Sequence, residues 1–228
     1  MRTTTNRGGP VTESRQAARR RTAPSWSTYR DSIGDRSGLF STVRTAWHPT
    51  KALYPGSYVD LSPSTAVPSV TYVDTDRRAA RFFADQARVR AELRGRTLPG
   101  AGTDFAFLHA DYTTPLPIPP AGCDLLISLY AGPVWEHCRQ YLAPHGLLLA
   151  NTSHGDASLA ALDPTLRLVA AVHQRTGTYR LDTGGLDDYL IPRNPSAADP
   201  DLIRRQGRGV AYTRTAFAYL FELVDEHR

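Results

Sequence analysis

Carboxylates follow two apolar stretches of this chain, close to the point where each stretch ends. Asp74 comes directly after the run VTYV, and Asp111 closes the segment FAFLHAD. In an open parallel sheet, ligands bind beyond the carboxyl ends of the strands, where an acidic side chain can accept the hydroxyl hydrogens of a ribose. Gly56 follows the earlier run KALYP, and a glycine there lets backbone and ligand approach closely. The pattern predicts a nucleoside-sized site at these strand ends.

Each of these residues also has a purely structural interpretation. A glycine after a strand commonly forms nothing more than a turn. Asp111 could simply start the turn that precedes the proline-rich residues 113–120. The sequence leaves both alternatives open.

The elements that would position these residues alternate between strand and helix. We expect the first five strands near residues 51–55, 70–74, 105–108, 123–129 and 147–151. Asp76 is placed to cap a helix that presents Ala79, Ala80, Phe83, Ala87 and Ala91 on one face and stops at Gly95. A short helix is expected over residues 134–142. This alternation predicts a parallel α/β sheet.

The later part of the chain breaks this rhythm. We expect a helix over residues 165–173 and a loop-rich insertion through Gly184-Gly185 and Pro192. Residues 209–212 and 216–224 then read as a final pair of strands joined by a tight turn, which must be antiparallel. The predicted fold class is α/β, a Rossmann-like doubly wound and mostly parallel sheet ending in an antiparallel hairpin.

The N-terminal part divides into two segments. Residues 1–25 carry six arginines and one glutamate with few apolar residues, which predicts a disordered basic tail. Apolar residues from Trp26 to Trp47 recur at helical spacing, interrupted near Gly34 and Gly38. We expect this segment to be a helical cover for the sheet, or alternatively a lid, within a single domain of residues 26–228.

Charge bears on the choice of partner. The chain has 27 basic and 22 acidic residues, so residues 26–228 are formally neutral once the tail is set aside. A neutral body argues against a dedicated phosphate-tracking surface, although the tail leaves nucleic-acid binding possible. Arginine greatly outnumbers lysine, Lys51 being the only lysine, which hints at a GC-rich bacterial genome.

Composition and cysteine usage predict a soluble protein of the cytoplasm. The chain is 41% hydrophobic and 21% charged, which is ordinary for a globular domain. No apolar run approaches the roughly 20 residues that span a bilayer, and no secretory leader is evident, so we expect no membrane partner. Cys123 and Cys138 are expected to be buried, reduced thiols.

Taken in order, the motifs resemble those of S-adenosylmethionine-dependent methyltransferases, a Rossmann-like superfamily. They are LYPG at the first strand, VTYVDTD at the second, HADY after the third, CDLLISLY at the fourth and LAPHGLLLA at the fifth. The similarity covers roughly residues 47–224, and it is the ordered set, more than any one motif, that is specific. The first motif, LYPGSYVD, is similar to that of a distinct bacterial branch of the superfamily. This similarity does not identify the substrate.

The resemblance implies S-adenosylmethionine as cofactor and assigns roles position by position. Residues lining the methionine half of the cofactor would be Tyr54, Pro55 and Gly56. Asp74 would bind the ribose hydroxyls, and Asp111 and Tyr112 would meet the adenine. The end of the fourth strand, Ser128, Leu129 and Tyr130, would face the transferred methyl.

The chain also departs from that family's pattern. Tyr54 stands where an acidic residue is usual, and Tyr58 and Asp60 replace the second and third glycines of the first motif. The crossover to the second strand is short and contains Pro63 and Pro68, so its usual helix is expected to shrink to a turn. These departures bear on whether and how the cofactor binds.

Methyl transfer needs alignment and, for a hydroxyl acceptor, removal of a proton. His154 is the best-placed base in the sequence, with Asp156 near enough to orient it, and Tyr130 and Tyr212 are weaker candidates. Alternatively, His154 is an ordinary loop residue.

The spacing of His, Asp and Glu residues matches no metal site, so we expect no metal. Neither a Gly-x-Ser-x-Gly elbow nor a Gly-x-Gly-x-x-Gly turn after the first strand is present.

We therefore predict an enzyme, a transferase that methylates a small-molecule substrate. Two alternatives stay open. One is a noncatalytic cofactor-binding or sensor protein with the same fold, and the other is an RNA methyltransferase that uses the basic tail. The acceptor, its pathway and the oligomeric state do not follow from the sequence.

Overall fold

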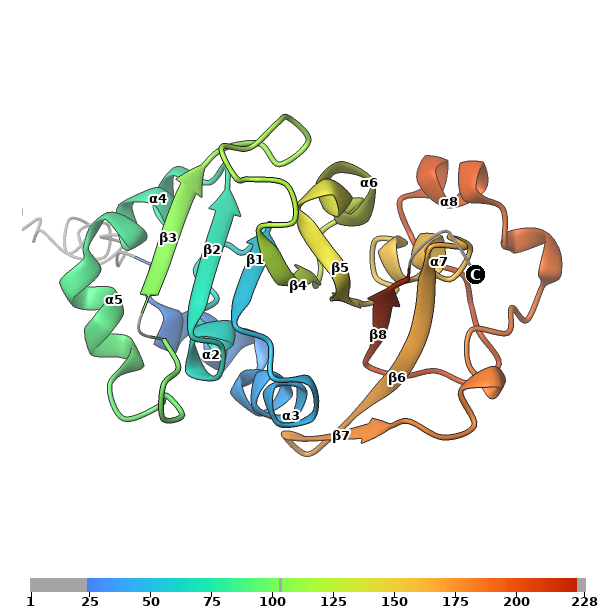
Figure 1. The fold of residues 1–228 in the computed structure, drawn as a ribbon, viewed down its shortest axis with the longest axis horizontal. Coiled ribbons are helices and arrows are strands. Elements are labelled where there is room, and N and C mark those ends of the chain that lie inside the picture. The colour runs from blue at the N-terminus through green and yellow to red at the C-terminus, as the bar shows by residue number, and fades with distance from the viewer. Residues whose placement is uncertain (1–23, 103, 225–228) are drawn as a thin grey trace, which may run out of the picture.

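The computed structural model describes residues 24–102 and 104–224, and residues 1–23 of the predicted basic tail lie outside this part. Eight strands form one sheet in the order β3-β2-β1-β4-β5-β8-β6-β7 (Figure 1). The strands are β1 (Lys51–Pro55), β2 (Ser69–Asp74), β3 (Asp104–His109), β4 (Cys123–Ser128), β5 (Leu142–Ala150), β6 (Leu166–Arg175), β7 (Thr178–Asp182) and β8 (Ala218–Leu223).

The first five strands are parallel to one another, and the remaining three each pair antiparallel with their neighbours. β1 pairs with β2 and β4, β2 with β3, and β4 with β5, all in parallel. β8 runs antiparallel to both β5 and β6, and β6 is antiparallel to β7. The predicted fold class is confirmed. All five of the first predicted strands form, because their apolar runs are bounded by turn-forming residues.

The predicted helix over residues 165–173 is wrong, because this segment is strand β6. Its residues Ala170, Ala171 and Val172 are all fully buried, since β6 contributes to the core on both faces of the sheet. Such a continuous apolar run has neither helical nor strand periodicity. Thr176 and Gly177 then turn the chain into β7, and both have positive φ, as the favoured two-residue hairpin turn requires.

The predicted strand over residues 209–212 is also wrong. Within the described chain it makes a single bridge, between Tyr212 and Pro192, and lies in the insertion. The antiparallel hairpin is therefore β6–β7, earlier in the chain than expected. The alternating run near residues 216–224 does form a strand, β8, which enters the sheet between β5 and β6.

Two helices precede the sheet. α2 (Trp26–Ile33) is capped by the Ser25 side chain and ends at Gly34, which has a φ of 85°. Gly38 does not interrupt α3 (Ser37–Trp47) but lies in its first turn, where an added Cβ would be 3.2 Å from the Tyr179 ring of β7. A glycine therefore lets the β6–β7 hairpin pack against this helix.

The arginine-rich helix after β2 is two helices. Asp76 caps α4 (Arg77–Ala84) as predicted, and Asp85 ends it while capping α5 (Gln86–Leu93). The break changes which residues face the core. Ala87 and Ala91 are exposed, and α5 instead buries Val89 and Leu93.

The remaining helices are short. The segment predicted as a helix over residues 134–142 forms one α-helical turn followed by a 3-10 turn. The remaining helices are η1 (Ser62–Thr65), α6 (Val134–Cys138), η2 (Arg139–Tyr141), α7 (Asp156–Ala160), η3 (Leu186–Asp188), η4 (Pro195–Ala197) and α8 (Pro200–Gln206). As predicted, η1 stands where a longer crossover helix would join β1 to β2, because prolines flank and enter this segment.

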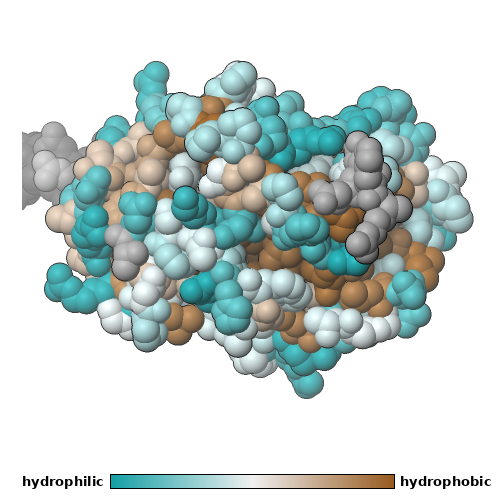
Figure 2. All heavy atoms as spheres, viewed as in Figure 1, coloured by the Kyte–Doolittle hydropathy of each residue, from teal (hydrophilic) through white to brown (hydrophobic). Residues whose placement is uncertain are grey.

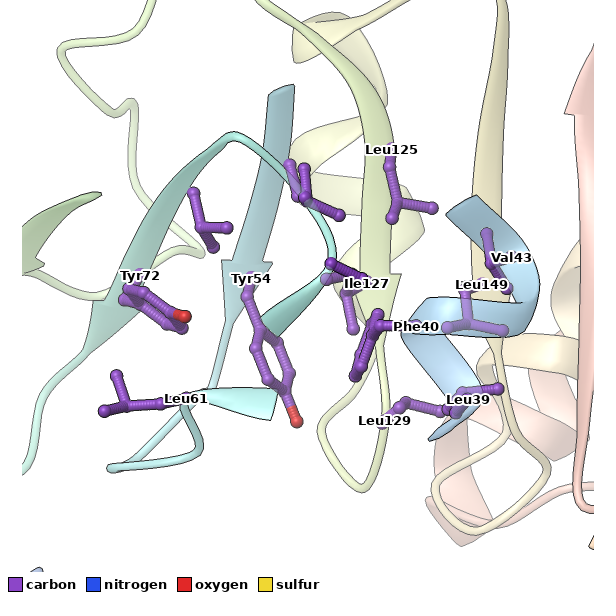
Figure 3. Close-up of a cluster of buried hydrophobic side chains, with 14 of the residues drawn as sticks. Leu39, Phe40, Val43, Tyr54, Leu61, Tyr72, Leu125, Ile127, Leu129 and Leu149 are labelled. Carbon is purple, nitrogen blue, oxygen red and sulfur yellow. The ribbon is translucent and has the colours of Figure 1, made fainter. Parts of the chain in front are cut away.

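The core lies on both faces of the sheet because successive strand residues point to opposite sides. Tyr54, Leu125 and Leu149 pack with α2 to α5, whereas Leu53, Leu126 and Leu148 pack with α6 and α7. Figure 3 shows the first face, with Leu39 of α3 beside Leu129 at the end of β4. Figure 2 shows hydrophobic side chains reaching the surface mainly on the half that holds β6 and β8. Among the described helices, none has the length and apolar character that crossing a membrane requires.

Candidate active site

The carboxyl ends of the parallel strands meet at one edge of the sheet. Pro55 pairs with Val73, Asp74 with His109, and Ser128 with Ala150, so the loops after β1, β2, β4 and β5 begin side by side. The sequence predicts a ligand site at this edge, and Gly56, Asp74, Tyr112, Tyr130 and His154 lie in or beside the loops that begin here.

Gly56 lies where the loops after β1 and β4 come closest. Its φ is 65°, and its N–H donates to the carbonyl of Val73 at 2.8 Å. A Cβ at this position would be 2.6 Å from the Cβ of Ala131. The sequence predicts that a ligand approaches this glycine, whereas the group that comes close to it in the structure is the chain's own β4 loop. Pro55, just before it, is a buried end of β1.

Asp74 ties two loops to the end of β2. One carboxylate oxygen accepts the N–H of Tyr58 at 2.7 Å, and the other accepts the N–H of Asp76 at 2.7 Å. Each carboxylate oxygen can accept two hydrogen bonds, so the described residues leave one acceptor position on each oxygen available to ligand hydroxyls. Asp74 is half-buried, which leaves the carboxylate within reach of a ligand.

Asp111 and Tyr112 follow β3 and take different positions. Asp111 is exposed and accepts hydrogen bonds from the N–H and the hydroxyl of Thr113, which lower its carboxyl pKa. This is the turn-starting arrangement of the alternative interpretation. Tyr112 reaches further in, because its hydroxyl donates to the carbonyl of Gly132 at 3.0 Å. Its ring also lies 3.9 Å from the Cβ position of Gly56, so it spans the gap between the β1 and β4 loops.

The three residues at the end of β4 are not equally exposed. Ser128 and Leu129 are buried, Leu129 under α3, so their side chains do not reach the surface of this edge as predicted. Tyr130 does, with 47% of its surface exposed. Its φ of 59° is strained for a large side chain, and such strain is concentrated at functional edges.

A chain of hydrogen bonds fixes the ring of His154. Asn151 Oδ1 accepts the N–H of Tyr130 at 3.4 Å and of Ser153 at 3.3 Å, so this atom is the carbonyl oxygen. The Ser153 hydroxyl, at 2.8 Å, must therefore donate its hydrogen to Asn151. Ser153 Oγ also lies 3.0 Å from Nδ1 of His154 and can only accept there. In the neutral ring Nδ1 thus carries the hydrogen, and Nε2 holds the lone pair of a base.

Asp156 does not orient His154, contrary to the prediction. Its carboxylate is fully buried and accepts the N–H of Val134 at 3.0 Å and of Trp135 at 3.2 Å, at the start of α6. Burial raises its pKa to about 6, against the opposing effect of these hydrogen bonds. The spacing of His154 and Asp156 gave no sign that α7 turns the carboxylate inward. Asn151 and Ser153 take the orienting role instead.

A buried ion pair lies beneath this edge on the face covered by α3. Arg36 Nη1 is 3.2 Å from Asp60 Oδ2, and the two side chains are 6% and 0% exposed. The hydroxyl of Tyr54 donates to the same oxygen at 3.3 Å, and Ser62 donates to the other through its N–H and its hydroxyl. Tyr54 is predicted to line the cofactor, but in the structure it is buried and serves this ion pair.

Two tyrosines complete what we call the Arg36 cluster, which comprises Tyr29, Arg36, Tyr54, Asp60 and Tyr130. The Arg36 guanidinium lies over the Tyr130 ring, 4.5 Å from its centre. Burial raises the pKa of Tyr29, and the charges of Asp60 and Arg36 act on it as well. The sequence pattern missed this cluster because its members come from different elements, and Asp60 was visible only as a departure from a glycine motif.

Two cavities border the strand ends and the outer helices. One, of about 280 Å³, lies beyond the end of β5 and is lined by Thr152, Arg193, Tyr212 and Tyr219 among others. A larger one, of about 520 Å³, lies between α6, α7 and α8. Within residues 24–102 and 104–224, no group of three or more His, Cys, Asp or Glu side chains is arranged to hold a metal ion.

The chain matches no protein-family model, and no curated protein matches its sequence. Several solved structures are distantly similar. The 16S rRNA methylase RmtB is 12% identical, with a TM-score of 0.48 over 86% of this chain and 65% of that one. The N-methyltransferase NodS from Bradyrhizobium japonicum WM9, in complex with S-adenosyl-L-homocysteine, is 13% identical, with a TM-score of 0.45 over 92% and 98%. A SAM-dependent methyltransferase from Aquifex aeolicus is 13% identical, with a TM-score of 0.44 over 64% and 91%. With TM-scores below 0.5, these likenesses carry no functional conclusion.

Proposed function

We propose that this protein binds S-adenosylmethionine at the carboxyl edge of the sheet and transfers its methyl group to a small molecule. The observation that carries the proposal is the strand order. Five parallel strands are followed by β8, inserted antiparallel between β5 and β6. The family that the sequence motifs resemble implies a mostly parallel sheet that ends in antiparallel strands, and this sheet brings Gly56 and Asp74 to the edge where ligands bind.

The residues present are compatible with such a cofactor. Asp74 keeps a free acceptor position on each oxygen, as two ribose hydroxyls require. When bound, S-adenosylmethionine supplies an electrophilic methyl group on a sulfonium. The chain's task is then to align the acceptor and remove its proton.

His154 is the proposed base. Its Nε2 has no hydrogen-bond partner among the described residues, and the Asn151–Ser153 chain leaves the lone pair on that nitrogen. His154 also lies against the β4 loop, since an added Cβ at Gly132 would be 2.9 Å from the His154 Cβ. The acceptor would therefore lie between this loop and the β5 loop.

A small acceptor fits the space at this end of the sheet. The cavity beyond β5 is about 280 Å³ and begins at Thr152, next to Ser153. Small-molecule sites usually occupy roughly 300 to 1,000 Å³, so this cavity is slightly smaller than that range and admits only a small acceptor.

Calorimetry with S-adenosylhomocysteine tests the cofactor assignment. We expect saturable binding that Asp74→Asn weakens by about tenfold or more, because one ribose hydroxyl loses a charged acceptor. Asp104→Asn is the control, since Asp104 is an exposed carboxylate at the opposite end of β3. Equal affinity of wild type and Asp74→Asn would contradict the ribose contact, and no binding at all would refute the proposal.

Turnover is tested with labelled S-adenosylmethionine and a cell extract separated into RNA and small-molecule fractions. We expect label in the small molecules. His154→Ala should reduce the rate by about 100-fold or more, since a positioned base contributes 10² to 10⁴. Ser153→Ala should lower the rate by a smaller factor, because the ring is then free to exchange tautomers. Label in RNA alone would transfer the activity to the other substrate class.

A noncatalytic cofactor-binding or sensor protein is the second candidate, favoured by one observation. Ala131 occupies the space beside Gly56, and Tyr112 bridges to Gly132, so the chain itself closes the gap between the β1 and β4 loops. Tight binding of S-adenosylmethionine without transfer of label to any fraction would support this candidate over the enzyme.

A further inference from the structure

Arg36 has more hydrogen-bonding capacity than its surroundings use. A guanidinium carries five N–H donors. In the part of the chain that the structure describes, one of its nitrogens, Nη1, has a hydrogen-bond partner, the Asp60 carboxylate. The side chain is nevertheless only 6% exposed. Among the described residues, the buried side-chain atoms without a hydrogen-bond partner are Trp26 Nε1 and Ser37 Oγ, so the unused Arg36 donors reach the surface, where a ligand can meet them.

The arrangement around Arg36 leaves those donors accessible in one direction. The Tyr130 ring covers a face of the guanidinium, whereas the N–H groups lie in its plane. Asp60 occupies one edge and is itself saturated by Tyr54 and Ser62. A planar anion that approaches the other edge would therefore find parallel donors, and Asp60 is the carboxylate that the described residues place against Arg36.

Tyr29 offers a further donor beside this edge. Its ring packs edge-on against Tyr58 at 5.1 Å, and within the described residues its hydroxyl has no hydrogen-bond partner. The charges of both Asp60 and Arg36 act on this hydroxyl. Together the unused groups are hydrogen-bond donors, which suit an oxyanion.

The cluster is connected to the proposed base rather than isolated from it. Tyr130 stacks on Arg36 through its ring, and its N–H donates to Asn151, the residue that sets the tautomer of His154 through Ser153. A ligand held at Arg36 and lying along the exposed Tyr130 ring would extend toward that base.

We infer that the methyl acceptor is a small aromatic acid, whose carboxylate binds the free edge of Arg36 and whose ring stacks on Tyr130. This inference rests on the proposed function for the identity of the reaction. The carboxylate contact itself does not depend on methyl transfer.

The contact is tested by calorimetry with para-hydroxybenzoate and its uncharged analogue para-hydroxybenzamide. The variant is Arg36→Lys, which keeps a charge for Asp60 but loses the planar fork. We expect the acid to bind wild type about tenfold or more tightly than the amide, and Arg36→Lys to remove most of that difference. Arg30→Lys is the matched control, because Arg30 also stacks on an aromatic ring, that of Trp26 rather than Tyr130. Its affinities should equal those of wild type.

Binding of methylthioadenosine, which has a nucleoside but no carboxylate, separates this inference from the proposed function. If it binds and the aromatic acid does not, the inference fails and the proposed function stands. If the acid binds through Arg36 but no nucleoside binds, the opposite holds. If Arg36→Lys instead weakens S-adenosylhomocysteine and leaves methylthioadenosine unchanged, the arginine holds the amino-acid end of the cofactor, and the acceptor assignment is overturned. Equal effects of Arg36→Lys on acid and amide would also overturn it.

Discussion

The Asp156→Asn variant should become more stable relative to wild type as the pH rises, which is the opposite of what is usual for a structural aspartate. Burial raises the pKa of this carboxyl from 3.8 to about 6, because hydrogen bonds from Ser128 and from the start of α6 offset only part of the desolvation. The folded state therefore holds the proton more tightly than the unfolded state. Between these two values wild type loses stability as the pH rises, whereas most structural aspartates gain it.

The size of the effect follows from the pKa difference. Each pKa unit corresponds to about 1.4 kcal/mol, so the change from 3.8 to about 6 amounts to about 3 kcal/mol. Of this, about 2 kcal/mol falls between about pH 4.5 and 7. The Asp156→Asn variant keeps one acceptor for α6 and has no charge to desolvate. Its stability relative to wild type should therefore improve by that amount across the interval.

Denaturant unfolding of both proteins at several pH values measures this difference, and other titrating groups cancel in it. Asp163→Asn is the matched control. Burial raises the pKa of Asp163, but hydrogen bonds from Thr165 and Trp135 outweigh burial and hold it below its ordinary value. The relative stability of that variant should fall as the pH rises. A flat difference for Asp156→Asn, or one with the sign of the control, would refute the reasoning.

Two further predictions concern packing and thiol chemistry. Gly56→Ala should destabilise the fold by about 2 to 4 kcal/mol, since it combines a positive φ with a collision at Ala131, whereas Gly207→Ala, at a similar φ in open space, should cost only about 1 kcal/mol. Denaturant unfolding measures both, and similar costs would contradict the close approach. Burial raises the pKa of each thiol, Cys123 and Cys138, to about 12. A disulfide reagent at neutral pH should therefore label them at the rate of unfolding, and rapid labelling of the native protein would be inconsistent with their burial.

The strand ends were predictable because the pattern that predicts them is local. A short apolar run followed by a turn residue indicates a buried strand wherever it lies in the sheet. Asp74 follows from this rule directly, as does the placement of Gly56 in the loop after β1. The helix start at Asp76 was equally local, since its side chain caps the next backbone N–H groups.

The segments that were missed depend on contacts between distant parts of the chain. β6 carries an apolar run whose type is decided by its partners β7 and β8. Arg36 lies before α3 and Asp60 before η1, and only packing of the helix on the sheet brings them together. The residues near Arg36 and Asp60 in the sequence form no pattern that would predict an ion pair between them. The reorientation of Asp156 toward α6 has the same origin.

The position of β8 bears on the order in which the chain becomes structured during synthesis. The β6–β7 hairpin can form as soon as it leaves the ribosome, because its two strands are adjacent in sequence. In the described sheet, however, β8 is its sole strand link to β5 and the parallel half. The hairpin must therefore wait for the insertion and for residues 218–223 to be translated before it can dock. During that interval the edge of β5 is open, which makes this strand the one where a chaperone or a second nascent chain would act first.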